Sequence, residues 1–300
     1  MSAGGSATGR PALPHRYTGK VRDLYEVSHD RILIVASDRI SVFDVVLPDE
    51  IPDKGRVLTG LSTFWFDQTA HIWPNHLVSA DPTDFPETAG PDIDGRAMLV
   101  EATSPVRLEC IARGYLFGSA WSEYSERGTV CGRVLPEGLR QAEELPEPIF
   151  TSTTKAESGH DETVTDAEAA ALVGDDVFEQ VREATLAIYR FARAHAVAQG
   201  VLLADTKLEF GTVDGRLLVI DEMLTPDSSR YWPAEQYEVG TSPPSFDKQF
   251  VRDHYLALGW DQTPPAPHLP QAVIDGTRAR YVEAYELITG ESFDEWFAPG

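Results

Sequence analysis

Alternating apolar and polar residues predict β-strands in the first third of the chain. The polar segment Ser28-His29-Asp30-Arg31 separates two apolar runs, which is typical of a hairpin. The segment Thr103-Ser104-Pro105 separates a second pair of runs, and residues 58–70 between the pairs have the spacing of a helix. The four expected strands cover residues 21–27, 32–37, 96–102 and 106–112.

Helical spacing dominates the second half. Thr165 followed by Glu168 is typical of a capping box at the start of a helix. Apolar residues recur every three or four positions from 176 to 199, and Gly200 is a stop signal for that helix. The turn Val213-Asp214-Gly215 predicts a hairpin. The other expected elements are strands at 201–204, 207–210 and 216–220, helices near 246–258 and 271–289, and an acidic surface loop at 141–148.

These elements together predict an α+β protein with two lobes. Residues 1–14 are small and polar, and we expect them to form a mobile tail. A β-rich amino-terminal lobe is expected over residues 15–104. A mixed lobe, richer in helices, is expected over residues 105–300.

The chain is strongly acidic. Its 300 residues contain 25 Lys and Arg against 48 Asp and Glu, so the formal net charge is −23. This argues against unspecific nucleic-acid binding, which needs a basic surface, but a few arginines in a pocket suffice for a small phosphorylated substrate. No apolar stretch is longer than that of residues 32–36, which is too short for a membrane span, and we expect no secretory signal. Two cysteines, Cys110 and Cys131, are typical of a reducing compartment, so we expect a soluble cytoplasmic protein.

The sequence lacks the common short motifs of nucleotide and metal sites. It contains no G-x-G-x-x-G loop, no Walker A motif, no H-E-x-x-H and no C-x-x-C. A G-x-S-x-G elbow is missing too, which weakens an α/β-hydrolase interpretation. A nucleotide, if the protein binds one, must be held by another architecture.

Charged residues cluster on the predicted hairpin and just after it. Alternation places Lys207 and Glu209 on one face of a strand, and Asp221 directly follows an apolar strand. Carboxylates at such positions suit Mg²⁺, and a nearby lysine can neutralise phosphoryl oxygens. The other interpretation is a solvated hairpin whose charges pair for solubility. The segment that follows favours the first interpretation.

Two segments combine arginine with hydroxyl side chains. Ser229 and Arg230 follow the acidic strand end and are typical of a phosphate-binding loop, although Pro226-Asp227 is also typical of an ordinary turn. Arg113 and Ser119 could hold a second anion, or could belong to a simple strand-to-helix turn.

Three polar segments could contact a substrate. Residues 151–162 have almost no apolar content, which is typical either of a mobile linker or of a loop that closes over a ligand. Residues 37–44 show a similar mixture after a buried strand. Residues 17–25 contain one glycine and could form a flap over a nucleotide, or simply begin a strand.

Taken together, these segments resemble the phosphoribosylaminoimidazole-succinocarboxamide synthase (SAICAR synthetase) family. The matching blocks follow the family's order over roughly residues 17–255, and the loop at 151–162 resembles that of the longer members. The blocks are YTGKVRDLYEV (17–27), SDRISVFD (37–44), ECIARGYLFGSAWSEY (109–124), IFTSTTKAESGHDE (149–162), DTKLEFG (205–211), DEMLTPDSSRYW (221–232) and SFDKQFVRD (245–253).

The resemblance implies an enzyme of purine biosynthesis. Such a ligase joins L-aspartate to the carboxylate of carboxyaminoimidazole ribonucleotide, with ATP converted to ADP and phosphate, and an acyl phosphate is the expected intermediate. Its two-lobed α+β fold, related to protein kinases and ATP-grasp enzymes, would hold ATP and Mg²⁺ between the lobes. The implied partners are these small molecules, with no nucleic acid and no membrane. The oligomeric state stays open, with a monomer favoured.

The resemblance also implies roles for individual residues. Glu209 and Asp221 match the carboxylates for the nucleotide-bound metal, and the segment 98–101 is expected to meet the adenine. The expected ATP-binding residues are Gly19, Lys20, Arg22, Glu101 and Glu209, the first three in the flap. The expected catalytic residues are Lys155, Asp161, Lys207 and Asp221.

The remaining assignments concern the two other substrates. The residues that match the cradle for the ribonucleotide's 5′-phosphate and sugar are Arg113, Ser119, Ser229 and Arg230. Those that match the loop approaching the imidazole and its carboxylate are Asp38, Arg39 and Ser41. Arg39 and Lys248 are the candidates for binding aspartate. The expected substrate-binding residues are Asp38, Arg39, Ser41, Arg113, Ser119, Ser229, Arg230 and Lys248.

Two other functions stay open on the sequence. A small-molecule kinase, or another ATP-dependent ligase with the same cleft, would bind ATP without depending on aspartate. A catalytically inactive acidic interaction module would be expected to lack Glu209 or Asp221, and both are present.

Overall fold

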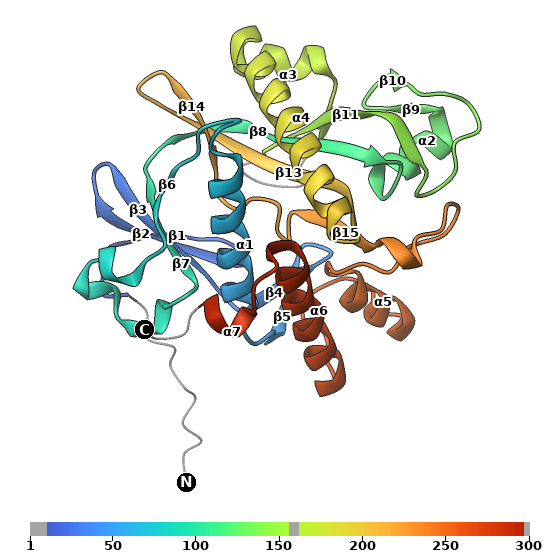
Figure 1. Cartoon of the computed structure of the whole chain (residues 1–300). Helices are drawn as coiled ribbons and strands as arrows, with labels where there is room; N and C mark the ends of the chain where they lie inside the picture. The colour runs from blue at the N-terminus through green and yellow to red at the C-terminus, as the bar shows by residue number, and fades with distance from the viewer. Residues whose placement is uncertain (1–10, 156–161, 297–300) are drawn as a thin grey trace.

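The structure, a computed structural model, describes residues 11–155 and 162–296. Its first sheet is antiparallel, with the strand order β1-β2-β3-β7-β6 (Figure 1). The predicted hairpin around residues 28–31 is confirmed, because β2 pairs with β3 across it. The strands are β1 (His15–Thr18), β2 (Arg22–Ser28), β3 (Arg31–Ala36), β6 (Leu77–Ser79) and β7 (Ala97–Glu101).

The second sheet is built around one long strand. Its order is β12-β11-β8-β13-β14, and β15 also pairs with β13. The strands are β8 (Ser104–Tyr115), β11 (Glu144–Thr154), β12 (Thr163–Val164), β13 (Val201–Val213), β14 (Arg216–Ile220) and β15 (Ser229–Pro233). The predicted hairpin of β13 and β14 is confirmed, with Val213 opposite Arg216.

Two predictions for this sheet are wrong. Residues 201–213 form one strand instead of two, because Asp205 pairs with arginines of both neighbouring strands and the charged segment therefore stays in the sheet. The expected loop at 141–148 overlaps β11, which begins at Glu144. A register shift between Glu144 and Ile149 lets the strand carry its prolines.

The helices agree more closely with the sequence patterns. The capping box of Thr165 and Glu168 is present, and the helix expected at 58–70 begins one turn sooner, at Lys54. No helix within the described ranges is long and apolar enough to cross a membrane. The helices are α1 (Lys54–Thr69), α2 (Ser119–Arg127), α3 (Asp166–Val173), α4 (Asp175–Ala198), α5 (Gln249–Leu258), α6 (Gln271–Thr289) and α7 (Phe293–Trp296).

Short elements complete the described chain. Two strand pairs lie outside the main sheets, β4 (Arg39–Val42) with β5 (Val45–Glu50) and β9 (Thr129–Val130) with β10 (Arg133–Val134). Single 3₁₀ turns occur at Pro82–Asp84, Glu87–Ala89, Pro91–Ile93 and Ala234–Gln236.

One hydrophobic core connects the two sheets. Ile34 of β3 and Leu208 of β13 belong to the same buried cluster, together with Trp65 of α1 and Tyr285 of α6. Helix α4 packs on the second sheet and buries its apolar face there, including Tyr189 (Figure 1). The sheets are therefore held together through shared side chains.

The carboxy-terminal helices also contact the amino-terminal part of the chain. Val251 and Tyr255 of α5 pack against Ile40 and Val42 of β4. The division into lobes at residues 104 and 105 stays a prediction. The first sheet's β7 ends at Glu101 and the second sheet's β8 begins at Ser104, so the predicted division falls at the first residue of β8. Residues 1–10 of the predicted tail lie outside the described residues, whereas Leu13 packs against a buried cluster of the first sheet.

Candidate active site

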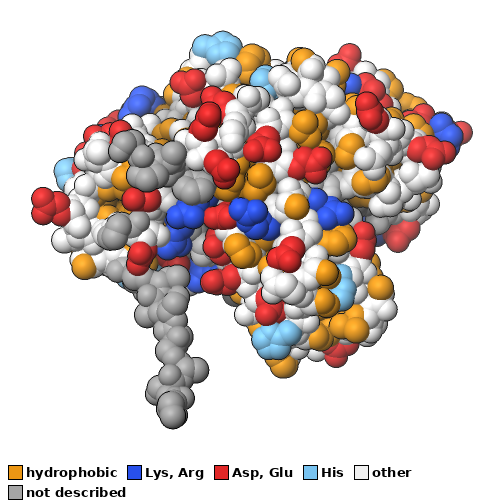
Figure 2. Space-filling view, turned by 60° about the horizontal axis from the view of Figure 1, so that its bottom comes forward, with side chains coloured by type: hydrophobic (Ala, Val, Ile, Leu, Met, Phe, Trp, Pro, Cys, Tyr) orange, Lys and Arg blue, Asp and Glu red, His pale blue; other side chains and the backbone are white. Residues whose placement is uncertain are grey.

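A cavity of about 620 Å³ lies between the two sheets. Part of its lining is apolar, made by side chains of β2, β3, β7 and β14. The rest is largely charged, with residues from both sheets and from the loop after β14. The apolar residues are Leu24, Ile32, Ile34, Val100 and Ile220, and the charged ones include Arg22, Glu109, Lys155, Lys207, Glu209, Asp221, Glu222, Asp227 and Lys248. Figure 2 shows Lys and Arg side chains in a band among acidic ones across one face of the molecule.

Lys207 is the centre of the charged part of the lining. Its Nζ donates to Glu109 at 2.6 Å and to Glu209 at 3.2 Å, and Lys155 pairs with the other oxygen of Glu209. Burial opposes the charged form of Lys207, but the two carboxylates outweigh it and raise its pKa. Lys207 and Glu209 thus share one face of β13, as predicted. Glu109 was missed, because it becomes a neighbour only through the pairing of β8 with β13.

Asp221 follows β14 in a left-handed conformation, with a φ of 68°. It pairs with Arg22 of β2, which also pairs with Glu222. Burial opposes ionisation of Asp221, but the charge of Arg22 outweighs it and holds the pKa of this carboxyl below its usual range. Arg22 therefore links the predicted flap to the second sheet across the cavity.

The other flap residues lie close by. Gly19 and Lys20 line the cavity, and the backbone N–H of Gly19 donates to the carbonyl of Arg22 at 2.7 Å. Lys20 pairs with the exposed Asp44 at 2.5 Å. Glu101 lines the cavity from β7 and accepts a hydrogen bond from Arg216 at 2.6 Å.

Arg113 and Arg230 form a second charged cluster around Asp205. Both guanidinium groups donate to the same oxygen, Oδ2 of Asp205. Arg113 also donates to Ser119 at 3.4 Å, and Ser229 shares a 2.8 Å hydrogen bond with Thr206. Burial lowers the pKa of Arg113, and Asp205 raises that of Arg230. Three of the four predicted cradle residues are therefore connected, Arg113 to Ser119 directly and Arg113 to Arg230 through Asp205.

Gly118 permits this close packing. Its φ is 60°, and a Cβ there would lie 2.9 Å from a guanidinium nitrogen of Arg230. A side chain at this position would therefore displace Arg230 from Asp205. The sequence pattern predicted that both arginines bind an anion, but it predicted no role for Asp205. In the sequence, Asp205 is only a single charged residue after an apolar run.

Of the remaining predicted residues, two line the cavity and two make contacts elsewhere. Ser41 and Lys248 line the cavity. Asp38 instead accepts the backbone N–H of Gly55 at 2.9 Å, and Arg39 donates to Asp23 at 3.2 Å. Asp161 lies outside the described residues. No local pattern predicted a role in the site for Lys54, Asp227 or His76. Asp227 and His76 line the cavity, and Lys54 contacts Asp227 from a distant part of the chain.

Glu209 and Asp221 fit a magnesium ion that accompanies a nucleotide. Both carboxylates line the same cavity, where Lys155 pairs with Glu209 and Arg22 pairs with Asp221. No group of three or more His, Cys, Asp or Glu side chains arranged for a metal occurs in the described ranges. Mg²⁺ bound to phosphates needs only one or two protein carboxylates, since phosphates and waters supply the other ligands.

His76 is a buried histidine in the cavity wall. Burial lowers its pKa to about 4, and the nearby charge of Asp221 offsets only part of this. In the unfolded chain His76 therefore takes up a proton near pH 6.5, whereas in the folded chain it does so only near pH 4. Protonation of His76 therefore does not reduce the free energy of unfolding above about pH 6.5. On acidification to about pH 4.5 it is expected to lower the free energy of unfolding by about 2–3 kcal/mol.

We expect His76→Gln to lose correspondingly less stability between about pH 7 and pH 4.5. The measurement is urea unfolding at a series of pH values. His29→Gln is the matched control, because the His29 side chain is 94% exposed and this variant should follow the wild type. An equal loss in His76→Gln and wild type would contradict the effect assigned to burial.

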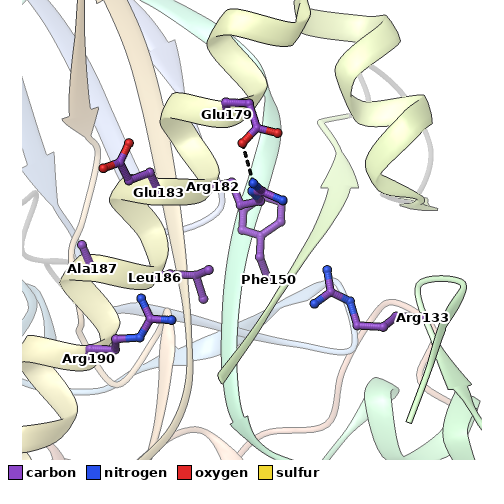
Figure 3. A pocket seen from close by; sticks show the side chains of 8 residues that line it. All are labelled: Arg133, Phe150, Glu179, Arg182, Glu183, Leu186, Ala187 and Arg190. Carbon is purple, nitrogen blue, oxygen red and sulfur yellow. Dashed lines mark hydrogen bonds and ion pairs between the residues drawn. The ribbon is translucent and has the colours of Figure 1, made fainter. Parts of the chain in front are cut away.

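A second hollow, of about 450 Å³, lies beside α4 (Figure 3). Arg182 in this hollow points to Glu179, at 2.5 Å, and Arg133 pairs with Asp166. Arg190 and Glu183 are exposed to solvent. Its charged groups thus pair locally or face water, so we do not assign it a function.

Comparisons with known proteins agree with the geometry. The family model described as SAICAR synthetase matches residues 15–267. The chain is 54% identical to the phosphoribosylaminoimidazole-succinocarboxamide synthase of Xanthomonas oryzae pv. oryzae (strain PXO99A), over 95% of this chain and 97% of that protein. The synthase of Xylella fastidiosa (strain 9a5c) is 51% identical over 95% and 97%.

Solved structures show the same relationship. The SAICAR synthase of Saccharomyces cerevisiae, complexed with SAICAR, superposes with a TM-score of 0.86 at 41% identity, covering 97% of this chain and 98% of that one. A SAICAR synthetase in complex with ADP shares the fold, with a TM-score of 0.69 at 24% identity and coverage of 92% and 98%. The sequence-based resemblance and the predicted α+β fold are thus confirmed, and the chain belongs to the SAICAR synthetase family.

Proposed function

We propose that the cavity between the sheets is the place where this protein carries out the reaction of its family. That reaction joins L-aspartate to the carboxylate of carboxyaminoimidazole ribonucleotide and converts ATP to ADP and phosphate. The observation that carries the proposal is that apolar side chains and a cluster of charged ones line a single cavity. Apolar side chains suit a flat adenine ring, and lysines and arginines suit phosphates.

We assign Glu209 and Asp221 to Mg²⁺, which would neutralise phosphate charge when bound with the nucleotide. Lys155 and Arg22 now pair with these two carboxylates. In the proposed complex, both cations turn to phosphate oxygens. Lys207, held between Glu109 and Glu209, is the group suited to the transferred phosphoryl group.

The chemistry requires the carboxylate to acquire a leaving group. A carboxylate oxygen of the ribonucleotide attacks the γ-phosphorus of ATP, and the bond to ADP breaks to give an acyl phosphate. The amine of aspartate then attacks the carbonyl carbon, phosphate leaves, and the nitrogen loses a proton. Such transfers depend mainly on positioning and charge neutralisation, which a rigid set of paired charges provides.

The cluster of Arg113, Ser119 and Arg230 is assigned to the ribonucleotide's 5′-phosphate, with Ser229 beside it. Lys248 and Arg39 are assigned to aspartate's carboxylates. Because both charged clusters come from one chain, a monomer is the favoured catalytic unit. The free thiols of Cys110 and Cys131 agree with a reaction in the reducing cytoplasm.

The test is phosphate release from ATP and Mg²⁺ with the carboxylated imidazole ribonucleotide, with and without L-aspartate. We expect release only when all components are present, together with a product that contains both substrates. Release that ignores aspartate would favour a kinase or another ligase. No release by folded protein would favour a binding module.

A further inference from the structure

Lys54 is a lysine whose ammonium group is removed from solvent. Its side chain is 0% exposed at the first turn of α1, and Nζ lies 2.8 Å from Oδ2 of Asp227. Burial lowers its pKa. The start of a helix disfavours a cation, because the helix dipole is positive there. Since an apolar side chain often replaces a buried charge without loss of stability, packing alone does not account for a lysine here.

The carboxylate of Asp227 accepts hydrogen bonds or ion pairs from three side chains, and only one of these three lines the cavity. Lys54 and Lys248 both pair with Oδ2, at 2.8 and 3.0 Å, and the hydroxyl of Tyr281 donates to Oδ1 at 2.7 Å. Lys248 is 12% exposed and lines the cavity, whereas Lys54 does neither. Burial opposes ionisation of Asp227, but the two lysines outweigh it and lower its pKa.

The cluster therefore contains two ammonium groups and one carboxylate. The neighbouring Glu222 does not cancel the excess, because Arg22 pairs with it and Thr225 donates to it at 2.6 Å. The surplus positive charge belongs to the lysine that can reach the cavity. An anionic substrate group is the partner that such a charge would attract.

We propose that Lys54 is a positioning residue, which serves as the permanent counter-charge of Asp227 and so leaves Lys248 available to a carboxylate of L-aspartate. The proposal rests on the proposed function. When Lys248 turns to the substrate, Asp227 keeps Lys54 and Tyr281 as donors, so no buried charge is left without a partner. Without Lys54, binding the substrate would cost Asp227 its remaining cation.

The test compares Lys54→Met with the double variant Lys54→Met/Asp227→Asn. The single variant is expected to raise the KM for L-aspartate about tenfold and to change the KM for ATP less than about twofold. The double variant removes the carboxylate that competes for Lys248. Its KM for L-aspartate is expected to return to within about threefold of the wild type.

Several outcomes would overturn the proposal. These are an unchanged KM for L-aspartate in Lys54→Met, an equal effect on all three substrates, or no rescue in a folded double variant. A residue that only stabilises the fold would lower the melting temperature without this selective, reversible change in KM. If the wild-type protein itself shows no aspartate-dependent release of phosphate, that result contradicts the proposed function and not the role of Lys54.

Tyr281→Phe provides a second test that does not require the single lysine variant to fold. It removes the neutral donor, so Asp227 depends more on its two lysines. We expect a smaller rise in the KM for L-aspartate, about threefold, at unchanged KM for ATP. An unchanged KM for L-aspartate in this variant would also contradict the proposal.

Discussion

Replacing Asp221 with asparagine is expected to lower the rate of aspartate-dependent phosphate release about a hundred- to a thousandfold. The substitution removes one negative charge from the proposed magnesium site and keeps the shape of the side chain. Asparagine tolerates the left-handed backbone that Asp221 adopts, so the fold should persist. Arg22 keeps Glu222 as an ion-pair partner, which limits the loss of stability.

Asp214→Asn is the matched control for this variant. Asp214 lies at the opposite end of the same hairpin, has a positive φ of 49° and is exposed. The same chemical change there should leave the rate unchanged. If Asp221→Asn retains more than about a tenth of wild-type activity, Asp221 does not have the electrostatic role assigned to it.

The sequence predicts several charged residues of the site, but it does not predict which residues they pair with. Alternation along β13 correctly places Lys207 beside Glu209, since a strand repeats every two residues whatever its neighbours are. The capping box at Thr165 is equally local and is equally well predicted. The same kind of reasoning divided β13 in two, because it treated Asp205 as a break in an apolar run.

The missed residues depend on contacts between distant parts of the chain. Asp205 is stable inside a sheet only because β8 and β15 each bring an arginine to it. Lys54 lies before the helix that the sequence pattern predicts at residues 58–70. Its burial follows from contacts with Asp227 and Tyr281, which come from a loop and a helix much further along the chain. Local patterns in a single sequence do not show which distant residues pair, so the partner of each of these charged residues is known only from the structure.

Replacing Arg230 with methionine is expected to raise the KM for the ribonucleotide about a hundredfold. Arg230 can offer a phosphate two charge-assisted hydrogen bonds, worth about 1.5 kcal/mol each, and about 3 kcal/mol corresponds to about two powers of ten. The KM for ATP should stay within about twofold, because Arg230 is assigned to the other anion. Steady-state kinetics with each substrate varied in turn measures both values.

Arg193→Met is a closely matched control for this second variant. Arg193 pairs with Glu144 and lies 5.8 Å from the Tyr115 ring, whereas Arg230 pairs with Asp205 and lies 5.6 Å from the Phe117 ring. Their side chains are 26% and 25% exposed. Both substitutions thus remove an ion pair and a ring contact. The carboxylates left behind differ in burial, since Asp205 is 6% and Glu144 52% exposed, but Arg113 still pairs with Asp205 in the Arg230 variant. Only Arg230→Met should change the KM for the ribonucleotide, and an unchanged value there would move the phosphate site elsewhere.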